Sequence, residues 1–244
     1  MTESRITSAL NDRVASIAIN RPDKRNAIDG PMFDALTNAL RLAQDDPGVH
    51  CVLLHGIGPH FSAGHDIAAL GTLWPQAEDG SVRRCFAAFA EQSKPLVAAV
   101  TGSAVGFGAT LLLHADWVVA GESAVFRFPF ADLGIVPEAG ASALLARRVG
   151  DLVARDWLMS ARPVTAAEAL QRGFVSRVMP DADVHAAANE YAARLAAKPQ
   201  DALLATRRLL QEGSTLPARE AIEREVTQLN VFIPAVARAS KTHG

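Results

Sequence analysis

The sequence predicts an α/β protein with a helical C-terminal region, and three observations support this fold class. Short apolar runs rich in β-branched residues, such as residues 14–20 and 49–55, alternate with segments of helical spacing. This repeated strand–helix order is typical of an α/β core. From residue 181 onward, alanine, leucine and charged residues recur at helical spacing. We therefore divide the chain into a core of residues 1–180 and a helical region of residues 181–244.

Each element follows from a local signal. Residues 6–10 and 14–20 form strands joined by a turn at Asn11-Asp12. Asp29 or Gly30 caps a helix that has Pro31 in its first turn and ends near residue 44. Further caps are Asp66, Asp151 and Thr165, the last in a capping box with Glu168. The other strands are expected at 49–55, 95–100, 117–120, 124–126 and 175–178, and the other helices at 67–70, 82–92, 109–114, 141–149, 152–160, 165–173, 183–197, 200–211 and 218–230.

Composition limits the cellular setting. The net charge of −2 and the pI near 6.4 give no electrostatic reason to expect nucleic acid binding. Cys51 and Cys85 form no C-x-x-C motif, which favours a reducing compartment. Residues 1–7 lack an apolar signal segment, no apolar run is long enough to span a bilayer, and the ending K-T-H-G is not a peroxisomal address. We expect a soluble cytoplasmic protein.

Residues 100–116 combine a buried strand, a glycine-rich turn and an apolar helix. Gly106 and Gly108 leave amides at the helix start unpaired, and free N–H groups at a helix N-terminus favour negative charge. The alternative is that these glycines only let the helix pack closely on a sheet. The segment lacks three nucleotide and hydrolase motifs: Leu111 replaces the third glycine of a dinucleotide fingerprint, no G-K-[ST] occurs, and no G-x-S-x-G surrounds Ser103.

A second loop, F-S-A-G-H-D-I, occupies residues 61–67. It follows the expected strand at 49–55 in the same way that the loop at 102–108 follows the expected strand at 95–100. Two such units can each aim one N–H at a single oxygen. With this pair, the sequence resembles the crotonase (enoyl-CoA hydratase/isomerase) superfamily from about residue 13 to residue 180. The motifs that carry the resemblance are R-P-D-K-R-N-A-I (21–28), F-S-A-G-H-D-I (61–67), G-S-A-V-G-F-G-A-T-L (102–111), H-A-D-W-V-V-A (114–120), F-P-F-A-D-L-G-I-V-P-E-A-G (128–140) and A-L-Q-R-G-F-V (169–175).

This resemblance implies a spiral of ββα repeats, a C-terminal helical region used in trimerisation, and a homotrimer or hexamer. It implies an acyl-CoA thioester substrate, whose enolate is stabilised by the backbone amides of His65 and Phe107. Coenzyme A is then part of the substrate, and we expect no separate cofactor, metal, nucleic acid or membrane partner. The residues that the resemblance assigns to substrate or CoA binding are Arg25, Ala27, Ser62, Ala63, Gly64, Asp66, Ile67 and Gly106.

Several of these residues also have plainer interpretations. Arg21, Lys24 and Arg25 either approach CoA phosphates or belong to a solvated loop. His55, His60 and His65 recur every five residues but span a strand and a loop, so metal binding is not expected. Ser62, His65 and Asp66 are neighbours in sequence, which does not make them a catalytic triad.

The carboxylates decide which reaction the resemblance favours. Hydratases of this family hold a water between two glutamates, and those two positions are Thr110 and Phe130 here. The segment A-V-G-F-G-A-T-L looks most like peroxisomal-type Δ3,Δ2-enoyl-CoA isomerases, which use a glutamate at the position of Glu138. Its apolar neighbours Ile135, Val136, Pro137 and Ala139 predict desolvation and a raised pKa.

The sequence therefore favours an enzyme of fatty acid metabolism that moves a 3-enoyl-CoA double bond to the 2 position. Glu138 takes a proton from C2 and returns it at C4. One alternative is hydration or another crotonase reaction with Glu138 acting alone, and another is a non-catalytic acyl-CoA binding protein. For Glu138 itself, the alternative is an exposed cap of the helix that begins near Ala141, and Asp132 is either a second acid or a solvated loop residue.

Overall fold

The structure, a computed structural model, describes residues 4–213 and 215–241. The chain divides into two compact units, Met1–Ala196 and Ala197–Gly244. The first unit contains the strands, and the second consists of two helices, α9 (Gln200–Gly213) and α10 (Ala218–Lys241).

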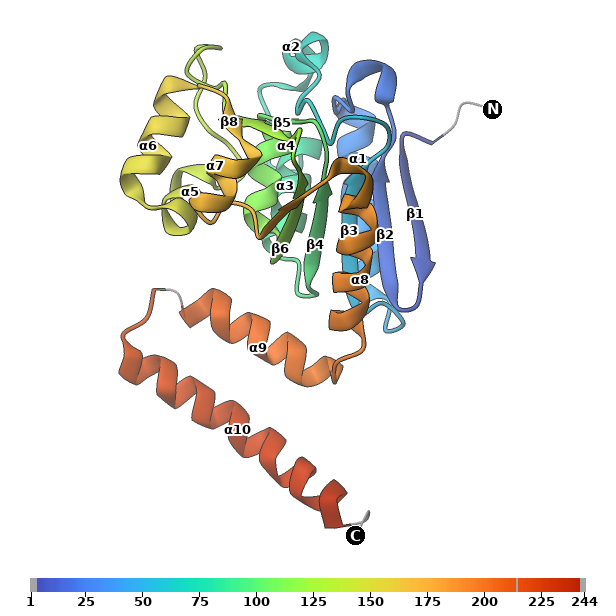
Figure 1. The fold of residues 1–244 in the computed structure, drawn as a ribbon, viewed down its shortest axis with the longest axis vertical. Coiled ribbons are helices and arrows are strands. Elements are labelled where there is room, and N and C mark those ends of the chain that lie inside the picture. Colours follow the sequence, from blue (N-terminus) through green and yellow to red (C-terminus); the bar gives the residue numbers. More distant parts are fainter. Residues whose placement is uncertain (1–3, 214, 242–244) are drawn as a thin grey trace. The chain divides into compact units, whose positions relative to one another are not determined.

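The first unit is built on a six-stranded sheet of order β1-β2-β3-β4-β6-β9 (Figure 1). The pair β1–β2 is antiparallel, and every later neighbour pair is parallel. A second sheet has the order β5-β7-β8, with β5–β7 parallel and β7–β8 antiparallel. The strands are β1 (Ile6–Asn11), β2 (Val14–Ile19), β3 (Cys51–Gly56), β4 (Leu96–Val100), β5 (Ser103–Val105), β6 (Trp117–Gly121), β7 (Val125–Arg127), β8 (Val164–Thr165) and β9 (Arg177–Met179).

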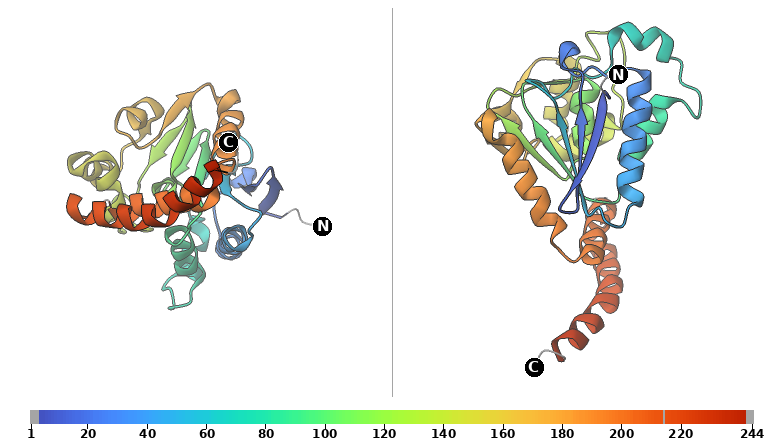
Figure 2. Two further views of the ribbon diagram at one scale, coloured as in Figure 1. Left: turned by 90° about the horizontal axis from the view of Figure 1, so that it is seen from below. Right: turned by 90° about the vertical axis from the view of Figure 1, so that its right-hand side faces the viewer.

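Helices cover both faces of the large sheet. Helices α1 (Gly30–Asp45) and α3 (Ser81–Ala90) pack together on one side, and α8 (Val184–Ala196) packs on β3, β4 and β6 from the other (Figure 2, right). Strand β3 is buried on both faces: Val52 and Leu54 join the apolar cluster under α1, while Cys51 and Leu53 join the cluster under α8. The predicted α/β core is confirmed.

The other helices of this unit are short. They are α2 (Leu70–Leu73), α4 (Phe107–Thr110), α5 (Ala141–Val149), α6 (Asp151–Ser160) and α7 (Ala166–Gln171), with 3₁₀ turns at Pro22–Lys24, Ile67–Ala69, Leu111–His114 and Asp181–Asp183. Three predicted caps are present: Asp29 accepts from Met32 N, Asp66 from Ala68 N and Thr165 from Glu168 N.

Two details of the predicted caps are wrong. Gly150, with φ +86°, is the N-cap of α6, so Asp151 is already helical and instead pairs with Arg155 at 2.7 Å. The capping box after β8 is half formed, because the Glu168 carboxylate accepts from Arg162 rather than turning back to the cap residue.

The end of the first unit lies later than the change in composition at residue 181. Ala188, Ala192 and Ala196 recur every four residues along α8 and are buried against the large sheet. The boundary between the two units therefore follows Ala196. Composition indicates that this region is helical, but it does not indicate which helix packs on the sheet.

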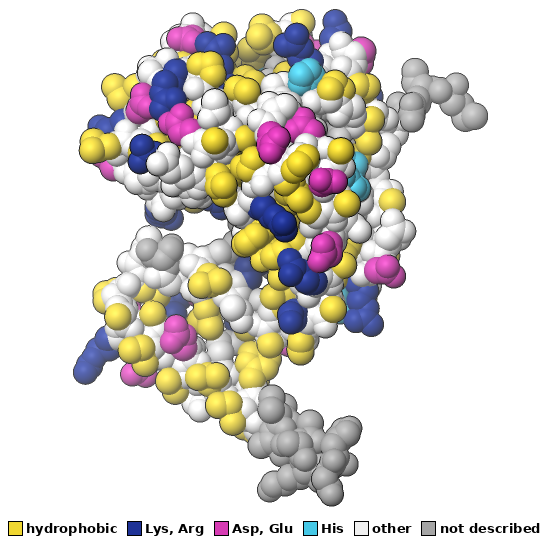
Figure 3. Space-filling view, viewed as in Figure 1, with side chains coloured by type: hydrophobic (Ala, Val, Ile, Leu, Met, Phe, Trp, Pro, Cys, Tyr) yellow, Lys and Arg dark blue, Asp and Glu magenta, His cyan; other side chains and the backbone are white. Residues whose placement is uncertain are grey.

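The second unit presents apolar side chains at its surface. Helices α9 and α10 contact each other, and Arg224 pairs with Glu212 at 2.6 Å. Along α10, the exposed residues Ile222, Val226 and Leu229 share one helical face, and hydrophobic side chains are visible on this unit in Figure 3. Its use in trimerisation stays a prediction.

Two further findings concern the charge distribution on the surface and the hydrophobicity of the helices. On the face drawn in Figure 3, basic and acidic side chains are interspersed. In the part of the chain that the structure describes, no helix is both long and apolar enough to cross a membrane.

A buried arginine fixes the helical segment that follows β5. Arg148 of α5 donates to the carbonyl oxygens of Leu112, Leu113 and Ala115, at 2.9, 3.3 and 2.7 Å. These carbonyls lie at the end of the turn that continues α4, where a helix leaves its acceptors unpaired. Burial lowers the pKa of the guanidinium, whereas Asp116 nearby raises it.

We predict that Arg148→Met lowers the free energy of unfolding by roughly 3 kcal/mol or more, because each buried carbonyl left unsatisfied costs about 1–3 kcal/mol. Urea unfolding followed by circular dichroism measures the change. The adjacent, exposed Arg147 supplies the control, and Arg147→Met should fall within about 0.5 kcal/mol of wild type. Equal effects of the two substitutions would contradict a stabilising role for the three hydrogen bonds of Arg148, which we call the Arg148 clamp.

Candidate active site

The two glycine-containing loops lie side by side at one edge of the large sheet. They follow β3 and β4, which are parallel neighbours, so both leave the sheet at the same edge. Val105 N donates to Ser62 O at 2.9 Å, and Ser62 N donates to Ser103 O at 3.1 Å. The predicted turn at 103–105 is thus the short strand β5, which is held by this loop and by β7.

Glycines allow the two loops to approach closely. A Cβ on Gly64, whose φ is +80°, would lie 2.4 Å from Val105 O and 3.0 Å from Phe107 N. A Cβ on Gly108 would lie 2.4 Å from Ser62 O. At Gly106 the space is open, but its φ of +54° favours glycine. The peptide that joins residues 64 and 65 therefore lies beside the amide of Phe107.

The amides of His65 and Phe107 are free to bind a ligand oxygen. Ile28 N donates to Gly64 O and Asp66 N donates to Ile28 O, so the N–H of His65 between them points away from Ile28. Phe107 is the first residue of α4, and its N–H has no acceptor within that helix. Within residues 4–213 and 215–241, neither amide has a hydrogen-bond acceptor. The glycine-rich segment thus allows close packing and also leaves an amide without an acceptor among the described residues, while its binding of an anion stays a prediction.

Glu138 points into the protein. Its Oε1 accepts a hydrogen bond from Thr110 Oγ1 at 2.5 Å, and its Oε2 is buried without a partner among the described residues. Burial raises the pKa of the carboxyl to about 7, although the bond from Thr110 acts to lower it. Helix α5 is capped by Gly140, so the alternative of an exposed Glu138 cap is wrong.

The cause expected for this burial is right only in part. Of the apolar neighbours in sequence, Ala139 is 8% exposed, but Ile135 and Val136 are 49% and 79% exposed. The carboxyl lies close to α4 and to α3. Burial raises the pKa of Cys85 on α3 to about 12, and the nearby charge of Glu138 acts in the same direction. His114 Nε2 lies 2.9 Å from Ala139 O and holds the residue that follows Glu138.

No second acid accompanies Glu138. Phe130 is 4% exposed and belongs to the apolar core, and Thr110 is buried. Asp132 is exposed and pairs with Arg127 at 2.7 Å, so it is a surface loop residue. Among the described carboxylates, only Glu138 has a buried oxygen without a partner.

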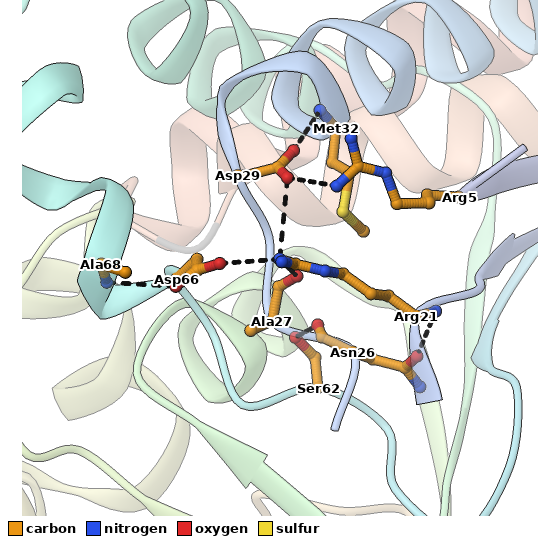
Figure 4. A network of polar contacts seen from close by, with 9 residues as sticks. All are labelled: Arg5, Arg21, Asn26, Ala27, Asp29, Met32, Ser62, Asp66 and Ala68. Carbon is orange, nitrogen blue, oxygen red and sulfur yellow. Dashed lines mark hydrogen bonds and ion pairs between the residues drawn. The ribbon is translucent and has the colours of Figure 1, made fainter. Parts of the chain in front are cut away.

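Arg21 connects the loop that precedes α1 with the loop that follows β3 (Figure 4). Its guanidinium donates to Asp66 at 2.8 Å and to Ala27 O at 3.1 Å, and it lies 3.6 Å from Asp29. Arg5 also pairs with Asp29. The contact with Arg21 lowers the pKa of Asp66. Arg21 is therefore occupied within the protein and does not fit the predicted contact with CoA phosphates.

Most of the other residues that were predicted to bind the substrate lie in the two loops that Arg21 connects. Arg25 and Lys24 are exposed and have no ion pair in the described part of the chain. Ala63 N donates to Arg25 O at 2.8 Å, and Ile67 is 69% exposed. The sequence analysis missed Asn26, a buried residue with φ +58° whose amide donates to the carbonyl oxygens of Ile57 and His60. An Asn in a left-handed turn position is a detectable signal for such a role.

The neighbouring polar residues form neither a triad nor a metal site. Ser62 Oγ donates to Asn26 O at 2.8 Å and accepts from Gly64 N, so it is not paired with His65. His55 lies by Ser16, and His60 by Ser103. Over the residues that the structure describes, no three His, Cys, Asp or Glu side chains are placed to hold a metal.

The chain is similar to known proteins over most of its length. A family model described as "Enoyl-CoA hydratase/isomerase" matches residues 9–240. "Probable enoyl-CoA hydratase EchA14" of Mycobacterium tuberculosis is 37% identical over 90% of this chain and 86% of its own length. The "2,3-dehydroadipyl-CoA hydratase" of Escherichia coli is 32% identical over 91% of this chain and 88% of its length.

Solved structures show the same fold. An enoyl-CoA hydratase/isomerase from Pseudoalteromonas atlantica has a TM-score of 0.82 at 34% identity, covering 95% of this chain and 91% of that chain. Enoyl-CoA hydratase EchA8_6 from Mycobacterium marinum has a TM-score of 0.80 at 37% identity, covering 86% of this chain and all of that one (100%). With a family model over most of its length and these relatives, the chain belongs to the enoyl-CoA hydratase/isomerase family of the crotonase superfamily.

Proposed function

We propose that this enzyme of acyl-CoA metabolism moves a 3-enoyl-CoA double bond to the 2 position, with Glu138 as its single proton carrier. The observation that carries the proposal is a carboxylate whose buried oxygen has no partner among the described residues and which bonds to Thr110 of α4, the helix that begins with the free amide of Phe107. A double-bond shift needs one group that removes a proton and returns it. Hydration also needs a positioned water and a second acid, and Thr110 and Phe130 supply no acid.

The proposed reaction has three steps. The thioester oxygen accepts from the amides of His65 and Phe107, and Glu138 removes a proton from C2. Negative charge then moves onto the thioester oxygen, where a preorganised donor typically contributes about a hundredfold or more in rate. The protonated Glu138 returns the proton at C4. A carboxyl with a pKa of about 7 is matched to both steps near neutral pH.

Thr110 positions the carboxylate in this scheme. Its hydroxyl donates to Oε1 and leaves Oε2 available for the proton. The hydrogen bond also favours the ionised form that acts as the base. Thr110 itself is buried and supplies no proton of suitable acidity.

Hydration remains the second candidate, because the relatives described above are named hydratases. In that reaction Glu138 alone would activate a water. A third candidate is acyl-CoA binding without turnover. We also propose a homotrimer or hexamer in the cytoplasm, with no cofactor beyond the CoA of the substrate, whose phosphates would lie near Lys24 and Arg25.

Assays with 3-hexenoyl-CoA and 2-hexenoyl-CoA separate these candidates. We predict isomerisation of the first that is much faster than hydration of the second. Glu138→Gln should lower kcat by about 10²- to 10⁴-fold, because it removes the general base. Robust hydration with negligible isomerisation would reject the proposal, and binding without turnover of either substrate would favour the third candidate.

The stability of Glu138→Gln is the internal control. Because burial raises the pKa from 4.5 to about 7, ionisation opposes folding, and stability falls as the pH rises between these values, by at most about 1.4 kcal/mol per pH unit. Glu138→Gln has no carboxyl to ionise at this position, so its stability does not fall with pH for this reason. It should be at least as stable as wild type above pH 7, so that lost activity does not reflect unfolding.

We predict that kcat/KM of the wild type increases with pH and levels off above a midpoint near 7, since only the ionised carboxylate accepts the C2 proton. In Thr110→Val, loss of the hydrogen bond should move the midpoint upward by about one pH unit. Stopped-time assays from pH 5 to 9 measure both profiles. A midpoint unchanged by the substitution would show that Thr110 does not tune Glu138.

Arg21 should position an oxyanion donor through Asp66, the residue after His65. We predict that Arg21→Gln lowers kcat by roughly 10- to 100-fold, because misplacing a donor by about 1 Å has effects of this size. Arg5→Gln, which removes only the outer pair with Asp29, is the control and should stay within about twofold of wild type. A similar loss in both variants would show a general effect on the loop.

A further inference from the structure

The side chain of His65 places a polar atom among aromatic rings. Its ring centroid lies 4.8 Å from that of Phe33, 5.8 Å from Phe107 and 6.3 Å from Phe86. Its Nε2 is buried and has no hydrogen-bond partner among the described residues. The three rings around it offer no donor or acceptor.

This arrangement is costly unless a ligand supplies the missing partner. A buried polar atom without a hydrogen bond costs about 1–3 kcal/mol, and native proteins rarely leave one without a reason. Burial lowers the pKa of His65 to about 4, so the ring is neutral at pH 7. It therefore offers a hydrogen bond rather than a charge. A phenylalanine would fill similar space without this cost.

The ring belongs to the residue whose amide is assigned to the thioester in the proposed function. The backbone amide of His65 is a proposed donor to the thioester oxygen, and bond lengths place Nε2 of a histidine roughly 5–6 Å from its own amide nitrogen. Phe107 and Thr110 are three residues apart on α4 and share a face. Phe107 packs on His65, and Thr110 bonds to Glu138. The two unpartnered atoms, His65 Nε2 and Glu138 Oε2, thus belong to residues that contact the same turn of α4.

We propose that His65 Nε2 recognises a hydroxyl group on the acyl chain, a few carbons from the thioester. The preferred substrates are then hydroxylated acyl-CoA thioesters rather than plain hydrocarbon ones. A hydroxyl fits because it both donates and accepts, and so it pairs with either neutral form of the imidazole. This inference rests on the acyl position in the proposed function and goes beyond it by naming the substrate class.

Binding of matched saturated ligands tests the proposal. Isothermal titration calorimetry on the full chain compares 4-hydroxybutyryl-CoA with pentanoyl-CoA, 5-hydroxypentanoyl-CoA with hexanoyl-CoA, and 6-hydroxyhexanoyl-CoA with heptanoyl-CoA. Each pair differs by a hydroxyl in place of a methyl group. We expect His65→Phe to shift the Kd ratio of at least one pair about tenfold toward the methyl ligand. Ratios unchanged at all three lengths would overturn the proposal.

A measurement on the wild type guards against a variant that fails to fold. The ¹⁵N resonance of His65 Nε2 should move when the preferred hydroxyl ligand binds and should not move with its methyl counterpart. Equal responses to both members of every pair would also overturn the proposal.

The failure of this inference is distinguishable from that of the proposed function. Isomerisation that depends on Glu138, together with ratios insensitive to His65, would reject only the hydroxyl preference. Absence of isomerisation would reject the proposed reaction, while the binding ratios would still report on His65.

Discussion

The close contact between the loops after β3 and β4 is the constraint on which the site depends. Ser62 pairs with β5, and Gly64 leaves no room for a side chain between Val105 and Phe107. A larger residue at 64 would push the loops apart and separate the two amides that are proposed to bind one oxygen. Because backbone groups provide the donors, their positions are set by the paired loops and not by side-chain rotamers. This rigidity is what electrostatic preorganisation requires.

Burial of Glu138 lowers the stability of the folded protein at neutral pH, and the rest of the fold must offset this cost. A carboxyl with a pKa near 7 is less stable ionised inside the protein than in water, so its environment opposes folding at neutral pH. The two-sided sheet core and the Arg148 clamp stabilise the turn of α4 that faces it. Stability is thus concentrated in the elements next to the site, while the site itself keeps polar atoms without partners.

Local signals predicted the elements better than the environment of single side chains. The helix cap at Asp29, the buried strands and the two loops were predictable because capping and periodicity are local. The desolvation of Glu138 was predicted from its apolar neighbours in sequence, of which Ala139 is buried but Ile135 and Val136 are exposed. Its actual neighbours, such as Thr110, are distant in sequence. The same holds for Arg21, whose partner Asp66 lies 45 residues away, and for the two-residue strand β8, which is too short to show alternation.

In the proposed isomerase, the polar groups of the site would act on a carbon chain rather than activate water. Where a two-glutamate hydratase site would hold a water, Thr110 turns its hydroxyl to Glu138 and Phe130 contributes only apolar surface. Removing a second acid removes the means to hold and orient that water. The remaining unpartnered nitrogen, on His65, lies instead among Phe33, Phe86 and Phe107. If Glu138 is the proton carrier and His65 the neutral hydrogen-bonding group, discrimination between substrates would depend on the acyl chain, because the proposed thioester contacts are made by backbone amides and are common to any acyl-CoA.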